Sequence, residues 1–153
     1  MQTVFFAADA AQLPWLAAAG GELDGLELAC VDAADLDPAQ LLELDTLMTG
    51  HDPVAMRETV LTPARVLGRP GALAALAQGT EERVVLCVRP ALCASLLGRS
   101  DAELDGIAED WELRAWGADD WNAQRYGALL RSLALLAEVA HNEQRGVYVR
   151  FDV

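Results

Sequence analysis

The sequence contains no lysine, and no positively charged residue precedes Arg57. All 11 basic residues are arginine, against 24 carboxylates, so the formal net charge is −13 at pH 7. Ten carboxylates lie before Arg57, which gives that part −10, while 14 acids and 11 arginines give the remainder −3. A surface of this sign repels nucleic acid and anionic lipid and attracts basic proteins. We therefore predict that the protein binds neither nucleic acid nor membranes.

Residues that carry catalytic chemistry are few. There are three cysteines, two histidines and three serines. The cysteines are odd in number and lack CxxC spacing, which indicates reduced, buried thiols rather than a disulfide framework or a zinc site. No serine lies in a G-x-S-x-G motif, and there is no Walker, dinucleotide-binding or EF-hand pattern. We predict no catalytic residue, no metal and no cofactor, and the sequence favours a protein without enzymatic activity.

The two histidines have plain structural interpretations. His141 lies three residues after Glu138, a spacing that forms half of a carboxylate-bridged metal site, but the sequence has no second such pair. A histidine near the end of a helix also interacts favourably with the helix dipole, and we adopt that interpretation. His51 follows Gly50 and precedes Asp52-Pro53, which indicates a loop; its alternative role is that of a general base.

Long uncharged segments are also absent. No apolar run approaches the ~20 residues that span a bilayer. The apolar opening segment has no basic residue before it and is interrupted by Asp9, so we predict no signal peptide and a cytoplasmic location. With 153 residues, 53% of them hydrophobic, the chain has enough apolar surface for one domain with a core.

The residue patterns predict a single α+β domain over residues 1–153. Its small mixed or antiparallel sheet would contain both terminal strands, packed with several helices that include a long C-terminal one. β-branched, aromatic and alternating segments predict strands at 2–7, 26–31, 82–88 and 147–151. Capping residues, proline and three-and-four spacing predict helices from Asp9 to Gly20, Pro38 to Gly50, 72–77, Pro90 to Gly98, Ser100 toward Ile107, and Asp119 or Asp120 to Asn142.

Two further patterns could belong to a binding surface. A second acidic run has no cation between its members: Asp101, Glu103, Asp105, Glu109, Asp110 and Glu112. It predicts a solvated helix face or a docking strip for a basic partner. Trp111, Trp116 and Trp121 recur every five residues, which indicates either packing at the start of the last helix or exposed anchors, because tryptophan is enriched in interface hot spots.

Several segments resemble the YfbM-like family, small bacterial proteins of uncharacterised function. Leu44-Asp45-Thr46-Leu47-Met48-Thr49-Gly50 resembles the family's L-H-x-L-L-T-G helix end, and 88–104 is similar to its L-x-P-E-x-V … E-L stretch. The long helix 129–142 followed by Gly146-Val147-Tyr148-Val149 is also similar. Asp45 replaces the family's histidine, so any role of that histidine is lost. The resemblance implies an α+β fold and no established activity.

The sequence leaves three functional hypotheses. The first is an acidic, non-enzymatic binding module that captures a basic protein, such as an immunity protein that neutralises a toxin. Its steering charges would be Asp32, Asp35, Asp37, Asp45 and Asp52, and its anchors would be Trp111 and Trp116. The second is a small-ligand-binding protein or enzyme, with a pocket built from Asp45, His51, Arg89 and the Trp111/Trp116 region. The third is an orphan domain whose acidity serves only solubility.

Overall fold

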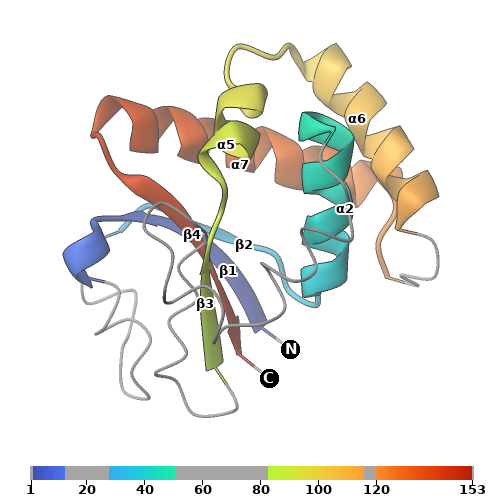
Figure 1. The fold of residues 1–153 in the computed structure, drawn as a ribbon. Coiled ribbons are helices and arrows are strands. Elements are labelled where there is room, and N and C mark those ends of the chain that lie inside the picture. Colours follow the sequence, from blue (N-terminus) through green and yellow to red (C-terminus); the bar gives the residue numbers. More distant parts are fainter. Residues whose placement is uncertain (1, 13–27, 51–82, 116–119, 153) are drawn as a thin grey trace.

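The computed structural model describes residues 2–12, 28–50, 83–115 and 120–152, which form an α+β fold with one sheet and four α-helices (Figure 1). The strands are β1 (Gln2–Ala8), β2 (Cys30–Asp32), β3 (Arg83–Cys87) and β4 (Gly146–Asp152). The helices are α2 (Pro38–Thr49), α5 (Pro90–Leu96), α6 (Asp101–Arg114) and α7 (Ala123–Asn142), with a 3-10 turn, η1 (Ala10–Gln12). The predicted fold class is confirmed.

The sheet has the order β2-β1-β4-β3, and all of its strand pairs are antiparallel. The two terminal strands are neighbours at its centre, paired without interruption from Gln2 opposite Asp152 to Ala8 opposite Gly146. The described ends of the chain therefore lie side by side (Figure 1). The prediction that both terminal strands belong to one sheet is confirmed.

The two central strands are buried on both faces of the sheet. Phe5 and Val149 face the helices and belong to the main hydrophobic core, whereas Phe6 and Tyr148 belong to a second cluster on the opposite face. Their side chains alternate between the faces and are largely apolar on both, because both faces are buried there, whereas Cys30 and Asp32 of the edge strand β2 are exposed. This explains why β1 reads as a continuous apolar run in the sequence. Arg150, which is 6% exposed, lies on the second face, with its Nε 3.0 Å from Asp152 Oδ2.

Helix α2 begins and ends where the sequence predicts. Asp37 caps its first turn by accepting a hydrogen bond from the Gln40 backbone N–H, and the Gln40 side chain accepts one from the Asp37 N–H. This reciprocal capping box satisfies two N–H groups that have no partner inside the helix. Gly50 ends the helix at φ 70°, a left-handed conformation that costs glycine little.

Other predicted boundaries differ from the structure. β2 is shorter and later than the predicted strand 26–31, and η1 is the only described part of the helix predicted after Asp9. Helix α6 continues past Ile107 to Arg114, because its apolar positions keep packing on α7. Helix α7 begins at Ala123, since Asn122 and not Asp119 or Asp120 provides the cap. The predicted segment 72–77 lies outside the described residues.

The helices pack on one side of the sheet, with α7 against the strands and α2, α5 and α6 around it (Figure 1). Trp111, Trp121 and Tyr126 form a cluster, here called the aromatic joint, that holds α2, α6 and α7 together. The ring centroids of Trp111 and Tyr126 are 4.1 Å apart, and those of Trp121 and Tyr126 are 5.1 Å apart. Trp111 Nε1 donates to the backbone oxygen of Gln40 at 2.9 Å, and Gln40 Nε2 donates to Tyr126 Oη at 2.7 Å. The joint fixes the position of α6 relative to α2.

No helix in the described part of the chain combines the length and the apolar character that crossing a bilayer demands.

Candidate functional site

The predicted steering charges of the N-terminal part do not form one exposed surface. Asp52 lies outside the described residues, together with Glu22, Asp24 and Glu27. Asp32 and Asp35 are exposed. Asp37 is half-buried, because its carboxylate caps α2. Asp9, which is also acidic, lies 3.7 Å from Arg145 Nε.

Asp45 is buried, so its predicted role as an exposed steering charge is wrong. Its side chain is 6% exposed, and Arg89 holds it with two hydrogen bonds: Nε to Oδ2 at 2.7 Å and Nη2 to Oδ1 at 3.1 Å. Thr49, one turn further along α2, accepts a hydrogen bond from Arg89 Nη2 at 3.2 Å. The pair joins α2 to the residue that precedes α5. The sequence had grouped Asp45 with Arg89 in a hypothetical ligand pocket, and the structure does bring them together, but as a buried ion pair.

Trp111 is fully buried, and the anchor interpretation is wrong for this residue. Its side chain has 0% exposure and lies in the aromatic joint, where its N–H is already used. The alternative interpretation from the sequence, that the tryptophans pack at the start of the last helix, agrees with the positions of Trp111 and Trp121. Trp116 lies outside the described residues. Among the described residues, the exposed large apolar side chain nearest to Trp111 in the sequence is Leu113, at 77% exposure.

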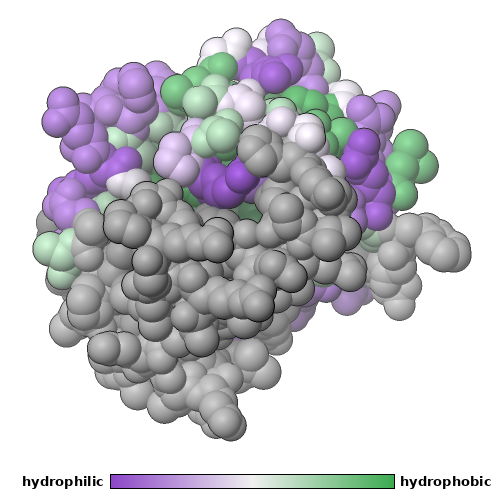
Figure 2. Space-filling view, in the orientation of Figure 1, coloured by the Kyte–Doolittle hydropathy of each residue, from purple (hydrophilic) through white to green (hydrophobic). Residues whose placement is uncertain are grey.

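The second acidic run forms the outer face of α6. Six carboxylates of this helix are exposed: Asp101, Glu103, Asp105, Glu109, Asp110 and Glu112. Arg131 pairs with Asp105 and lies 3.8 Å from Asp101, and Arg99 lies 3.6 Å from Glu103. Hydrophilic residues line the edge of the molecule where α6 runs (Figure 2). Among the described residues, the α6 carboxylates that lie within 4 Å of an arginine are therefore those in the first half of the helix.

The two acidic segments of the sequence meet at the start of α7. Arg125 donates to the backbone oxygens of Ala34 at 2.6 Å and Asp120 at 2.8 Å. Glu112 Oε2 accepts a hydrogen bond from the backbone N–H of Ala123 at 3.1 Å. The loop before α2, the end of α6 and the start of α7 are thereby tied together.

We call this place the acidic junction. It consists of exposed Asp35, Glu112 and Asp120 with half-buried Asp37 and the half-buried cation Arg125. Burial raises the pKa of Tyr126, and the carboxylates of Asp37 and Glu112 add to that effect, whereas the hydrogen bond from Gln40 and the charge of Arg125 oppose it. Asp37 and Glu112, which are distant in the sequence, therefore act on the same phenol.

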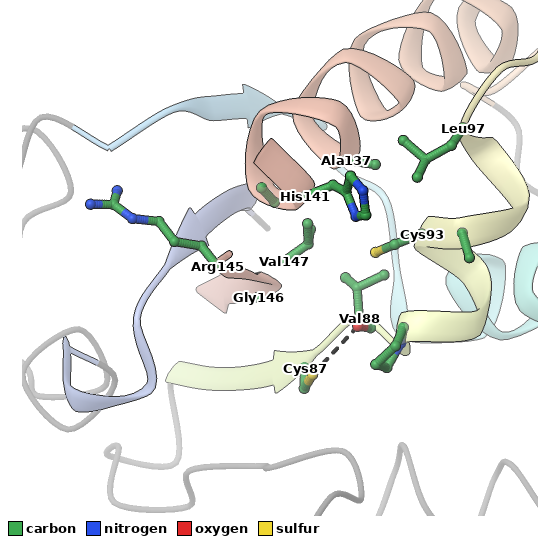
Figure 3. A pocket seen from close by; sticks show the side chains of 12 residues that line it. Cys87, Val88, Cys93, Leu97, Ala137, His141, Arg145, Gly146 and Val147 are labelled. Atoms are coloured by element: carbon green, nitrogen blue, oxygen red, sulfur yellow. Dashed lines mark hydrogen bonds between the residues drawn. The ribbon is translucent and has the colours of Figure 1, made fainter. Parts of the chain in front are cut away.

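A separate cavity of about 320 Å³ lies between α5, the end of α7 and the start of β4 (Figure 3). Most of its lining is apolar, and its polar side chains are Cys87, Cys93, His141 and Arg145. The His141 imidazole and the Cys93 thiol point into the space between the two helices, whereas the Arg145 guanidinium points away from it. Among the described residues there is no group of three or more side chains suited to hold a metal ion.

The thiols of the cavity are protonated at neutral pH. Burial raises the pKa of Cys87 to about 11 and that of Cys93 to about 12, and the neighbouring Cys87 and Asp45 contribute to the increase at Cys93. The thiolate is the nucleophilic form of cysteine. This environment therefore does not support nucleophilic catalysis by either residue.

Alkylation tests this conclusion. Cys30 is exposed, so the prediction of a buried thiol is wrong for this residue. At pH 8 we expect iodoacetamide to modify Cys30 first and to modify Cys87 and Cys93 at least about a hundredfold more slowly. Time-resolved peptide mass spectrometry measures the three rates separately. Cys93 reacting as fast as Cys30 in the folded protein would show that it is an activated thiol.

Comparison of the chain with protein-family models, with curated proteins and with solved structures finds no match. Membership of the YfbM-like family stays a prediction from the sequence.

Sequence reasoning missed the cavity. Cys93 and His141 are separated by 48 positions, and neither is part of a motif. They share a cavity only because α5 packs beside the end of α7. The small residues Ala137 and Ala140, which make room for it, have the same spacing as ordinary core residues of an amphipathic helix.

Proposed function

We propose that the protein is a non-enzymatic, acidic binding module that captures a basic protein, as a toxin-neutralising immunity protein does. The acidic junction supports this proposal. Its hydrogen bonds bring together three segments that carry exposed carboxylates, from the N-terminal third, from α6 and from the start of α7. The overall charge of −13 extends the attraction beyond direct contact.

The junction has the two kinds of group that a binding surface uses. Its carboxylates would speed the association of a basic partner, and such rates fall as salt screens the charges. Leu113, about 100° further around α6 than Glu112, supplies an exposed apolar side chain at the border of the junction. It replaces the buried Trp111 as the proposed apolar contact.

The proposal is tested with the products of genes that neighbour the one encoding this chain. Each basic product is expressed together with this protein, and copurification identifies the partner. Association is then measured by surface plasmon resonance at 50 and 300 mM salt. We expect the association rate constant to fall at least tenfold between the two salt concentrations. Absence of a basic partner among these products would contradict the proposal.

Removing carboxylate charges from the acidic junction tests whether the junction is the binding surface. The triple variant Asp35→Asn, Glu112→Gln, Asp120→Asn removes three charges but keeps an acceptor oxygen at each position. Asparagine is also tolerated at the φ of 64° that residue 35 adopts. We expect its association rate constant at 50 mM salt to be about tenfold lower, with a smaller change in dissociation.

The matched control neutralises three other exposed carboxylates, in the variant Glu103→Gln, Glu138→Gln, Glu143→Gln. It has the same net charge as the junction variant, so it separates local attraction from overall charge. Equal effects of the two triple variants would show that the junction is not the binding surface.

A further inference from the structure

The cavity beside α5 has a size that suits a small organic molecule. Cavities of about 150 Å³ in proteins hold benzene, and ligand pockets begin near 300 Å³. At about 320 Å³ this cavity has room for one or two fused rings. The walls come from α5, α7, the end of β3 and the start of β4, so they belong to the folded framework.

The chemistry of the walls favours an uncharged ligand. Val88, Pro90, Leu97 and Val147 provide apolar surface. Arg145 is the arginine of the lining, and its guanidinium points away from the cavity (Figure 3). There its Nε lies 3.7 Å from Asp9, and its Nη1 lies 3.5 Å from Glu143. An anion in the cavity would face no inward-pointing guanidinium, in a protein of net charge −13.

Two groups in the lining point to an aromatic molecule with a polar substituent. Cys93 places its sulfur atom beside the cavity (Figure 3), and sulfur makes favourable contacts with aromatic rings. The His141 imidazole points inward from the last turn of α7 (Figure 3). His141 is exposed, so its imidazole lies at the open side of the cavity, where a ring nitrogen can bond to a ligand hydroxyl.

We propose that this cavity binds a small, uncharged aromatic molecule that carries a hydroxyl group. The ring lies against the Cys93 thiol and the aliphatic side chains, and the hydroxyl bonds to the His141 imidazole. The site is separate from the acidic junction, so it does not depend on the proposed capture of a basic protein.

The experiment uses 2-naphthol as the probe and the full chain as the receptor. Binding is followed by the ¹H–¹⁵N chemical shifts of amides in α5, the last turn of α7 and the start of β4. We expect these amides to shift together, with a Kd of 1 mM or tighter, and those around the acidic junction to stay unchanged. Absence of shifts at α5 and α7 with 2 mM 2-naphthol would overturn the proposal.

Filling the cavity provides the main control. Ala94 lines the cavity and is exposed, so Ala94→Phe fills the space without disturbing the core. Ala91 is exposed on the same helix but does not line the cavity, so Ala91→Phe adds the same side chain elsewhere. We expect Ala94→Phe to weaken binding at least tenfold and Ala91→Phe to leave it unchanged. Equal binding by the two variants would show that 2-naphthol occupies another site.

His141 and the ligand charge are tested separately. We expect His141→Leu to weaken 2-naphthol binding about three- to tenfold, because one hydrogen bond is lost. We expect 2-naphthoate, which has the same rings but a negative charge, to bind at least tenfold more weakly than 2-naphthol. Unchanged affinity in His141→Leu, or tighter binding of 2-naphthoate, would overturn the proposed ligand class.

Discussion

Replacing Arg89 with alanine is expected to lower the free energy of unfolding by roughly 3–5 kcal/mol. The substitution leaves the Asp45 carboxylate, 6% exposed, without its bidentate partner. The Thr49 hydroxyl still donates to Asp45 Oδ1 at 2.9 Å, but no cation then offsets the charge of the buried carboxylate. Urea denaturation of wild type and variant, followed by circular dichroism, measures the difference in the free energy of unfolding.

Two further variants separate the charge from the packing. Replacing both members of the pair, in Asp45→Leu with Arg89→Met, should restore most of the lost stability, because no buried charge then remains between α2 and α5. Glu103→Gln removes a member of the exposed Arg99–Glu103 pair and should cost less than about 0.5 kcal/mol. A loss in the double variant as large as in Arg89→Ala would show that shape, and not the unpaired charge, determines the cost.

Trp111→Ala is expected to lower the free energy of unfolding by about 3–5 kcal/mol, since it empties the centre of the aromatic joint. The side chain is fully buried, packs against the Tyr126 ring in a tilted arrangement and donates to the Gln40 backbone oxygen. Trp111→Phe keeps most of the volume but removes the donor, so it should cost about 1–3 kcal/mol. Denaturant unfolding measures both values.

The control for the aromatic joint is Leu113→Ala. Leu113 lies on the same helix but is 77% exposed, so its truncation should change the free energy of unfolding by less than about 0.5 kcal/mol. It should nevertheless weaken the binding of the proposed basic partner. Comparable losses of stability for Leu113→Ala and Trp111→Ala would contradict the burial on which the correction for Trp111 depends.

These expectations separate the residues that stabilise the fold from those available to a partner. In the sequence, nothing distinguishes Asp45 and Trp111 from the other acidic and aromatic residues of their segments. In the structure both are buried, whereas Asp35, Glu112 and Asp120 are exposed. The proposed binding surface is therefore smaller than the acidic composition alone indicates, but it draws on three separated segments.

Local patterns were sufficient for most of the fold. The apolar run at 2–7 and the alternation at 147–151 predicted the two central strands, because strand formation depends on neighbouring side chains at a period of two. Asp37, Pro38 and Gly50 predicted both ends of α2, since capping is a contact between residues a few positions apart. The boundary of α7 was less well placed, because Asn122 and two nearby aspartates are all suitable caps.

The sequence by itself determined the α+β class, the shared sheet of the terminal strands, the large negative charge and the lack of catalytic motifs. Tertiary structure alone decided that Asp45 pairs with Arg89, that Trp111 is buried, that the two acidic segments meet at the start of α7, and that His141 shares a cavity with Cys93. These four features join residues between 44 and 91 positions apart. Charge and side-chain type are properties of single residues, whereas pairing, burial and cavities depend on which distant elements pack together.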